Sequence, residues 1–129
     1  MKTNHPNSKL IEEQLKQIKN TMVQKNLTSV DLPTYEWNPD ELDAECGNGE
    51  YLVREKSNED QSMFWNLYIR RVKLKKGELL FDLQEVYEDT HDNYDELNWY
   101  KDQPLTKYNF EEELVENALR SILWTVENS

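Results

Sequence analysis

Apolar residues recur at helical spacing near the two ends of the chain and at strand spacing in between. Residues 8–26 predict an amphipathic helix, because their apolar positions are separated by four, three and four residues. Ser8 is expected to cap this helix. The same spacing is that of a short coiled coil, so a helix packed on a sheet and a weak homodimer both remain open. The apolar stripe consists of Ile11, Leu15, Ile18 and Met22.

Residues 109–127 predict a second helix with a broader apolar stripe. Asn109 followed by Glu112 resembles a capping box, in which two side chains satisfy free backbone N–H groups at a helix start. Trp124 lies on the opposite side from the stripe, so it either contacts another element or faces a partner. The stripe consists of Phe110, Leu114, Val115, Ala118, Leu119, Ile122, Leu123 and Val126.

The middle of the chain is rich in the aromatic and β-branched residues that are typical of strands. Three strands are expected at about 50–56, 63–75 and 78–88, with a short fourth strand near 97–101. The dipeptide Lys76-Gly77 fits a two-residue hairpin turn between the second and third of these, because Gly supplies the positive φ that such a turn needs.

This hairpin turn sets the register of the two long strands. It places Arg71 opposite Asp82 as a cross-strand ion pair on one face, and Val72 opposite Phe81 on the other. The apolar positions at 65, 67 and 69 are out of phase with those at 72 and 74. A slip of one residue predicts either a β-bulge near Arg70-Arg71 or a strand buried on both faces.

These elements together predict an α+β fold, with an antiparallel sheet of three to four strands packed by an N-terminal and a C-terminal helix. A chain of 129 residues is long enough for one core, so residues 1–129 are expected to form a single domain. Residues 28–49 contain two prolines and two glycines and predict an acidic connection, with a short helical turn after Asn38-Pro39.

The composition is polar and strongly acidic. Charged residues are 32% of the chain and the formal net charge is −11, whereas aromatic residues at 11% indicate a folded domain. An acidic field repels nucleic-acid phosphates and anionic membranes and attracts basic proteins. The acid is concentrated: residues 63–77 carry five basic side chains and no acidic one, but residues 78–129 carry 14 acidic and three basic ones.

The single cysteine, Cys46, permits no internal disulfide, and the sequence contains no apolar run of membrane-spanning length. The N-terminal residues lack the apolar core of a signal peptide. These features favour a cytoplasmic protein that has no contact with membranes.

Several chemistries are poorly matched by the sequence. Three glycines leave little room for a phosphate-binding loop, and two histidines are too few for a zinc site with a single cysteine. The acids around His91 lack the alternation and the central glycine of an EF-hand calcium loop. Paired carboxylates are common enough to arise by chance, so no catalytic residue, metal or cofactor is predicted.

The basic strand and the acidic stretch beside it receive different interpretations. The five cations between Arg70 and Lys76 are expected to pair with acids of the same chain rather than with nucleic acid. Residues 86–102, "VYEDTHDNYDELNWYKD", combine six acids with four aromatic rings, and such a surface suits a basic protein partner. The predicted partner-binding residues are Asp89, Asp92, Tyr94, Asp95, Glu96, Trp99 and Tyr100.

In composition the chain resembles two groups of small acidic proteins, although the resemblance covers no alignable stretch. One group is the immunity proteins and antitoxin-type inhibitors of basic nuclease toxins, and the other is the phage-encoded nucleic-acid mimics. Either resemblance implies a stoichiometric, steric and electrostatic block of a basic, nucleic-acid-acting partner. The alternative is a small ligand-binding or catalytic domain, with a pocket between the sheet and the C-terminal helix lined by Trp65, Tyr68 and Trp124.

Overall fold

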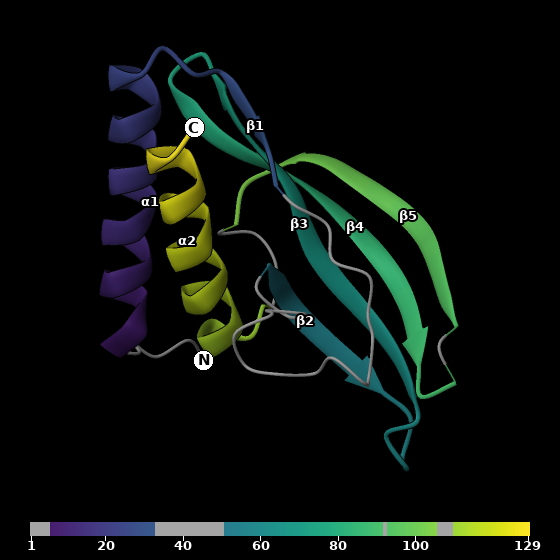
Figure 1. Cartoon of the computed structure of the whole chain (residues 1–129). Helices are drawn as coiled ribbons and strands as arrows, with labels where there is room; N and C mark the ends of the chain where they lie inside the picture. The colour runs from purple at the N-terminus through teal and green to yellow at the C-terminus, as the bar shows by residue number, and fades with distance from the viewer. Residues whose placement is uncertain (1–5, 33–50, 92, 106–109) are drawn as a thin grey trace.

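The structure is a computed structural model that describes residues 6–32, 51–91, 93–105 and 110–129. It contains a five-stranded antiparallel sheet and two helices (Figure 1), which confirms the predicted α+β fold. The strand order is β1-β3-β4-β5, and β2 pairs with the other half of the β3 edge that β1 occupies. In chain order the elements are α1 (Pro6–Gln24), β1 (Ser29–Asp31), β2 (Leu52–Ser57), β3 (Met63–Lys75), β4 (Glu78–Asp89), β5 (Tyr94–Gln103) and α2 (Glu112–Glu127).

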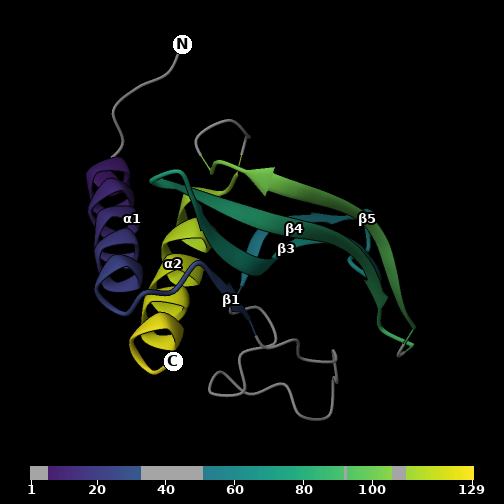
Figure 2. The same ribbon diagram turned by 90° about the horizontal axis from the view of Figure 1, so that it is seen from above.

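The two helices lie side by side and run in the same direction (Figure 1). At their C-terminal ends, Lys25 Nζ donates hydrogen bonds to the backbone oxygens of Glu127 and Ser129 at 2.7 and 2.9 Å. Figure 2 shows both helices at one end of the sheet, with the opposite ends of β3, β4 and β5 extending beyond them. Neither α1 nor α2 therefore covers the far half of the sheet.

The main core lies between the helices and the sheet. The predicted stripe of α1 contributes to it, because Ile18 and Met22 are fully buried, so this helix face is covered within the chain itself. Most of the predicted stripe of α2 packs in this core as well, while Leu114 packs against a second, smaller apolar cluster. From the sheet and α2 the main core contains Val53, Leu67, Ile69, Val72, Phe81, Leu83, Val115, Ala118, Leu119, Ile122 and Val126.

The register predicted for the central hairpin is confirmed. Arg71 pairs with Asp82 and Val72 with Phe81. Lys76 and Gly77 form the turn with φ of 50° and 76°, the left-handed values of a tight hairpin. The predicted bulge is also present, since the register shifts between Ile69 and Arg71 and leaves Arg70 as the extra residue.

Neither helix begins at the residue where its predicted cap placed the start. Helix α1 begins at Pro6, which suits a first turn, and Ser8 therefore lies inside the helix. Helix α2 begins at Glu112 with Glu111 as its N-cap, and the predicted Asn109 cap lies outside the described residues. The start of α2 is set by β2: the N–H of Glu111 donates to the Val53 carbonyl, and the Glu111 carboxylate accepts from the N–H of Glu55 at 2.8 Å.

The sheet contains more strand than the apolar pattern predicts. Residues 29–31 of the expected acidic connection form β1, and the short strand expected near 97–101 is the ten-residue β5. The helical turn expected after Asn38-Pro39 lies outside the described residues. Within the described ranges, neither helix has the length and apolar character needed to cross a membrane.

Candidate functional site

Strand β5 has an unusual exposure for a sheet strand. Its residues 95–101 are all exposed, so both of its faces meet solvent, because it lies at the sheet edge and continues beyond the helices. Three large apolar side chains share this exposure: Leu97 at 38%, Trp99 at 45% and Tyr100 at 37%. Aromatic side chains of this kind are typical anchors of protein–protein interfaces.

The pleat of the sheet divides the predicted partner-binding residues between two faces. Asp95 lies opposite Tyr87, whereas the next residue, Glu96, lies opposite Val86 and points to the other face. A bulge follows, and Trp99 and Tyr100 are again neighbours on opposite faces. Each face of β5 therefore presents one carboxylate and one large aromatic ring. Asp95 and Tyr100 lie on one face, and Glu96 and Trp99 lie on the other.

Asp89 has a structural role that the sequence pattern did not indicate. Its carboxylate is nearly buried and accepts hydrogen bonds from the Tyr87 hydroxyl at 2.7 Å, the Asn93 side-chain amide at 3.0 Å and the N–H groups of His91 and Asn93. The bonds from Asn93 and Tyr87 hold the pKa of Asp89 below its usual range. Asp89 thus stabilises the β4–β5 turn, while Asp92 lies outside the described residues.

A row of buried polar side chains crosses the sheet on the face opposite the main core. Glu88 Oε2 accepts hydrogen bonds from Asn66 Nδ2 at 2.6 Å and from the Tyr68 hydroxyl at 2.7 Å. The Glu88 side chain is 2% exposed, and burial raises the pKa of this carboxyl above its ordinary value of 4.5. Burial beside Glu88 likewise raises the pKa of the Tyr68 phenol.

The bulge residue Arg70 extends this row to β5. Its guanidinium lies over the Tyr68 ring, 5.0 Å from the centroid, and Nε donates to Gln84 Oε1 at 3.2 Å. Nη2 donates to the Tyr94 hydroxyl at 2.9 Å, so Tyr94 is joined to the interior of the sheet. Of the seven predicted residues, Tyr94 and Asp89 therefore anchor β5 and its turn, while Asp95, Glu96, Trp99 and Tyr100 form its exposed surface.

We expect Glu88→Gln to stabilise the protein at neutral pH. A carboxyl with a raised pKa holds its proton more tightly when folded, so the free energy of unfolding decreases as pH rises above about 4.5. Glutamine keeps the acceptor oxygen for Tyr68 and Asn66 and does not ionise. The gain in melting temperature over the wild type should therefore grow between pH 4.5 and pH 7, measured by thermal unfolding. An equal or lower melting temperature at pH 7 would show that Glu88 is stable there as a carboxylate.

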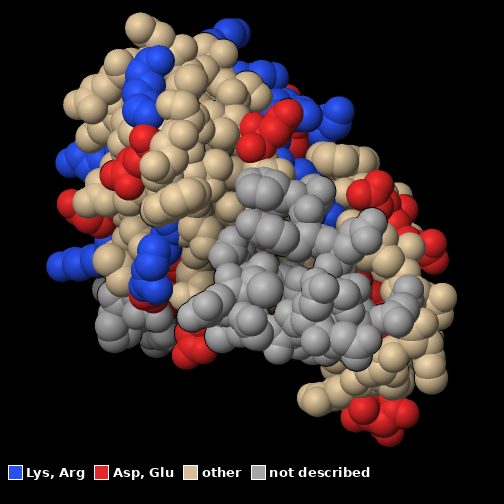
Figure 3. Space-filling model, viewed as in Figure 1, with Lys and Arg blue, Asp and Glu red and all other residues tan. Residues whose placement is uncertain are grey.

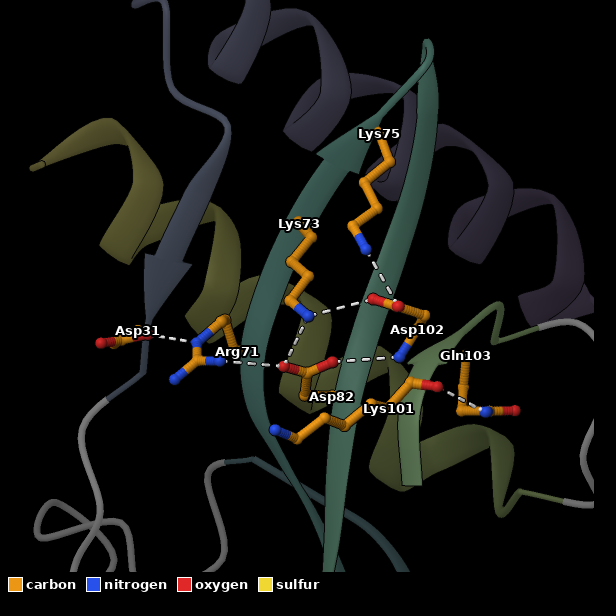
Figure 4. Close-up of polar contacts among 8 residues, drawn as sticks. All are labelled: Asp31, Arg71, Lys73, Lys75, Asp82, Lys101, Asp102 and Gln103. Atoms are coloured by element: carbon orange, nitrogen blue, oxygen red, sulfur yellow. Dashed lines mark hydrogen bonds and ion pairs between the residues drawn. The ribbon is translucent and has the colours of Figure 1, made fainter. Parts of the chain in front are cut away.

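The basic strand is neutralised by acids from three other strands (Figure 4). Asp82 is completely buried, and its carboxylate contacts Arg71 Nη1 at 3.1 Å and Lys73 Nζ at 3.0 Å. The N–H of Asp102 donates to the other Asp82 oxygen at 3.0 Å. Asp102 accepts in turn from Lys73 and Lys75, and Asp31 pairs with Arg71. Three acids and three cations alternate in this cluster, which confirms the predicted pairing within the chain for Arg71, Lys73 and Lys75. Arg70 bonds instead to the uncharged side chains of Gln84 and Tyr94.

This pairing leaves the acids of β5 with little compensation. Asp95 and Glu96 are exposed and have no cation within ion-pair distance among the described residues. Lys101 stacks over the Trp99 ring, 5.7 Å from its centroid. On the face drawn in Figure 3, lysines and arginines gather on the side of the helices, and the far part of the sheet shows acids.

One of the three residues expected to line the alternative pocket, Trp124, lies elsewhere. Trp124 is 66% exposed on the outer side of α2, so it does not line a space between α2 and the sheet. Tyr68 lies in a small apolar cluster with Leu52 and Val86. In the ranges that the structure describes, no three His, Cys, Asp or Glu side chains are grouped so as to hold a metal ion.

Comparisons of the chain with protein-family models, with curated proteins and with solved structures found no match.

Proposed function

We propose that this protein is a cytoplasmic, protein-binding inhibitor that blocks a basic, nucleic-acid-acting partner. The observation that carries the proposal is the exposure of β5 on both faces, with Leu97, Trp99 and Tyr100 beside the uncompensated carboxylates of Asp95 and Glu96. Apolar anchors surrounded by charge supply affinity, and the charges speed association with a partner of opposite sign.

The electrostatic arrangement supports a basic partner in particular. Three of the β3 cations, Arg71, Lys73 and Lys75, are paired with acids inside the chain, so they offset little of the field of β5. A protein that acts on nucleic acid needs a basic site to hold phosphate, and such a site is attracted to this surface. Binding would then exclude nucleic acid at one inhibitor per partner, without turnover.

We expect the double substitution Asp95→Ala and Glu96→Ala to weaken partner binding about fivefold, since each exposed charge contributes up to about 1 kcal/mol. The loss should fall mainly on the association rate and should shrink at high salt. The partner is first captured from native lysate on the tagged protein, released by salt and identified. Binding of the purified pair is then measured by surface plasmon resonance at several salt concentrations.

The matched control removes two acids from another element. Glu12 and Glu13 are exposed on α1, so their replacement by alanine changes the net charge equally without touching β5. Equal losses of affinity in the two double variants would contradict a specific role of β5, because the net charge alone would then explain the loss. Failure of the bound protein to displace a nucleic-acid oligonucleotide from the partner would contradict the proposed block.

A further inference from the structure

The outer side of β5 is an open strand edge. β5 is the last strand of the sheet path, and within the described ranges no strand pairs with its far side. An edge strand presents alternate backbone N–H and C=O groups to solvent, where an added strand can bind them. Two bulges interrupt β5, one between the pairs Val86–Glu96 and Gln84–Trp99 and one before Gln103. The longest regular stretch before a bulge is therefore Tyr94 to Glu96.

The backbone alternation over this stretch follows from the turn. The N–H of Asp89 donates to the Asn93 carbonyl at 3.2 Å, which makes this a hydrogen-bonded pair. Pairs alternate in an antiparallel ladder, so the pair of Tyr87 and Asp95 is hydrogen-bonded as well. Glu96 belongs to the alternate pairs, and its N–H points to the open side.

Charge selects the strand that can occupy this edge. Asp95 and Glu96 are adjacent and point to opposite faces, so an added strand meets one carboxylate on each face. A second copy of β5 would set these acids against each other over the regular stretch. The register that would pair Lys101 of one copy with Glu96 of the other has to cross both bulges. Each copy also carries a net charge of −11, so charge repulsion disfavours a second copy at this edge.

We propose that β5 accepts an extended segment of the basic partner as an additional strand, at Tyr94–Glu96, and that the segment carries two consecutive lysine or arginine residues. The inference rests on the proposed function and names how the partner is held. Backbone hydrogen bonds supply the pairing, and the adjacent cations reach Asp95 on one face and Glu96 on the other.

The test uses a blocked peptide, Thr-Val-Lys-Lys-Val-Thr, and the full ¹⁵N-labelled chain observed by NMR. Binding should shift the amides of Tyr94–Leu97 and slow hydrogen exchange at the Glu96 N–H. The same peptide with alternate backbone nitrogens methylated keeps its charges but cannot pair as a strand, and it should bind at least tenfold more weakly. This arm does not alter the protein. Equal binding of the methylated peptide would overturn the inference. So would the absence of shifts in β5 at the highest concentration at which the peptide is soluble.

Two variants of one position separate strand addition from charge. Glu96→Ala removes the carboxylate only, whereas Glu96→Pro also removes the outward N–H without breaking a bond to β4. Binding of the captured partner should weaken a few-fold in Glu96→Ala and at least tenfold further in Glu96→Pro, with the amide spectrum of β3 and β4 unchanged. Equal loss in both variants would overturn strand addition and leave the proposed function standing. No loss in either would remove β5 from the interface and overturn both.

Discussion

Replacing Asp82 with alanine is expected to lower the free energy of unfolding by about 3 kcal/mol. The Asp82 carboxylate is fully buried and joins Arg71, Lys73 and the Asp102 backbone, so its loss leaves cations and an N–H group without their common acceptor. The expected loss is at the lower end for a buried pair, because Arg71 keeps Asp31 and Lys73 keeps Asp102. Urea unfolding at neutral pH measures the change.

The control for Asp82 is an ion pair on a helix surface. Glu116 pairs with Arg120 at 3.0 Å, one turn apart on α2, and the Arg120 side chain is 63% exposed. Glu116→Gln should lower the free energy of unfolding by about 0.5 kcal/mol or less. If Asp82→Ala lost no more than this control, Asp82 would not be the centre of the ion-pair cluster.

Trp99→Ala is expected to weaken partner binding by about 2 kcal/mol, or roughly thirtyfold. The ring is 45% exposed on β5, on the same face as the Glu96 carboxylate, where a partner can bury it. Trp99 belongs to neither buried apolar cluster, so the melting temperature should fall less than on loss of a core side chain. Isothermal titration with the purified partner measures the affinity, and thermal unfolding checks the fold.

Trp124 provides a control of the same residue type on another element. It is 66% exposed on α2, on the side away from the core, so Trp124→Ala removes a more exposed ring at no expected loss of affinity. The reverse result, with binding lost in Trp124→Ala and kept in Trp99→Ala, would move the interface from β5 to α2.

Local patterns in the sequence predict the central hairpin closely. Gly77 fixes the turn, the turn fixes the pairing of Arg71 with Asp82, and the change of apolar phase locates the bulge at Arg70. The helix stripes are predicted for the same reason, since burial imposes a period on apolar residues. The start of α2 is not predicted in this way. Glu111 is held by β2, and a contact so distant in sequence leaves no local signal.

The candidate surface is harder to predict because exposure removes the pattern. Both faces of β5 are exposed to solvent, so apolar and polar residues do not alternate along it. Only the aromatic residues at its centre indicated a strand. Asp89 and Glu88 lie in a dense acidic run, yet both are buried. Glu88 bonds to Asn66, 22 positions away, whereas Asp89 bonds to residues two and four positions away in its own turn. The available signal for the polar row was the spacing of Gln84, Val86 and Glu88 at every second position, which places all three on one face of β4.

The most direct measurement of the central claim is amide hydrogen exchange of the wild-type chain, free and bound to its purified partner. The proposal predicts new protection at Tyr94–Lys101, centred on the Glu96 N–H, with α1 and α2 unchanged. Protection on α2 around Trp124, with β5 exchanging as in the free protein, would contradict it.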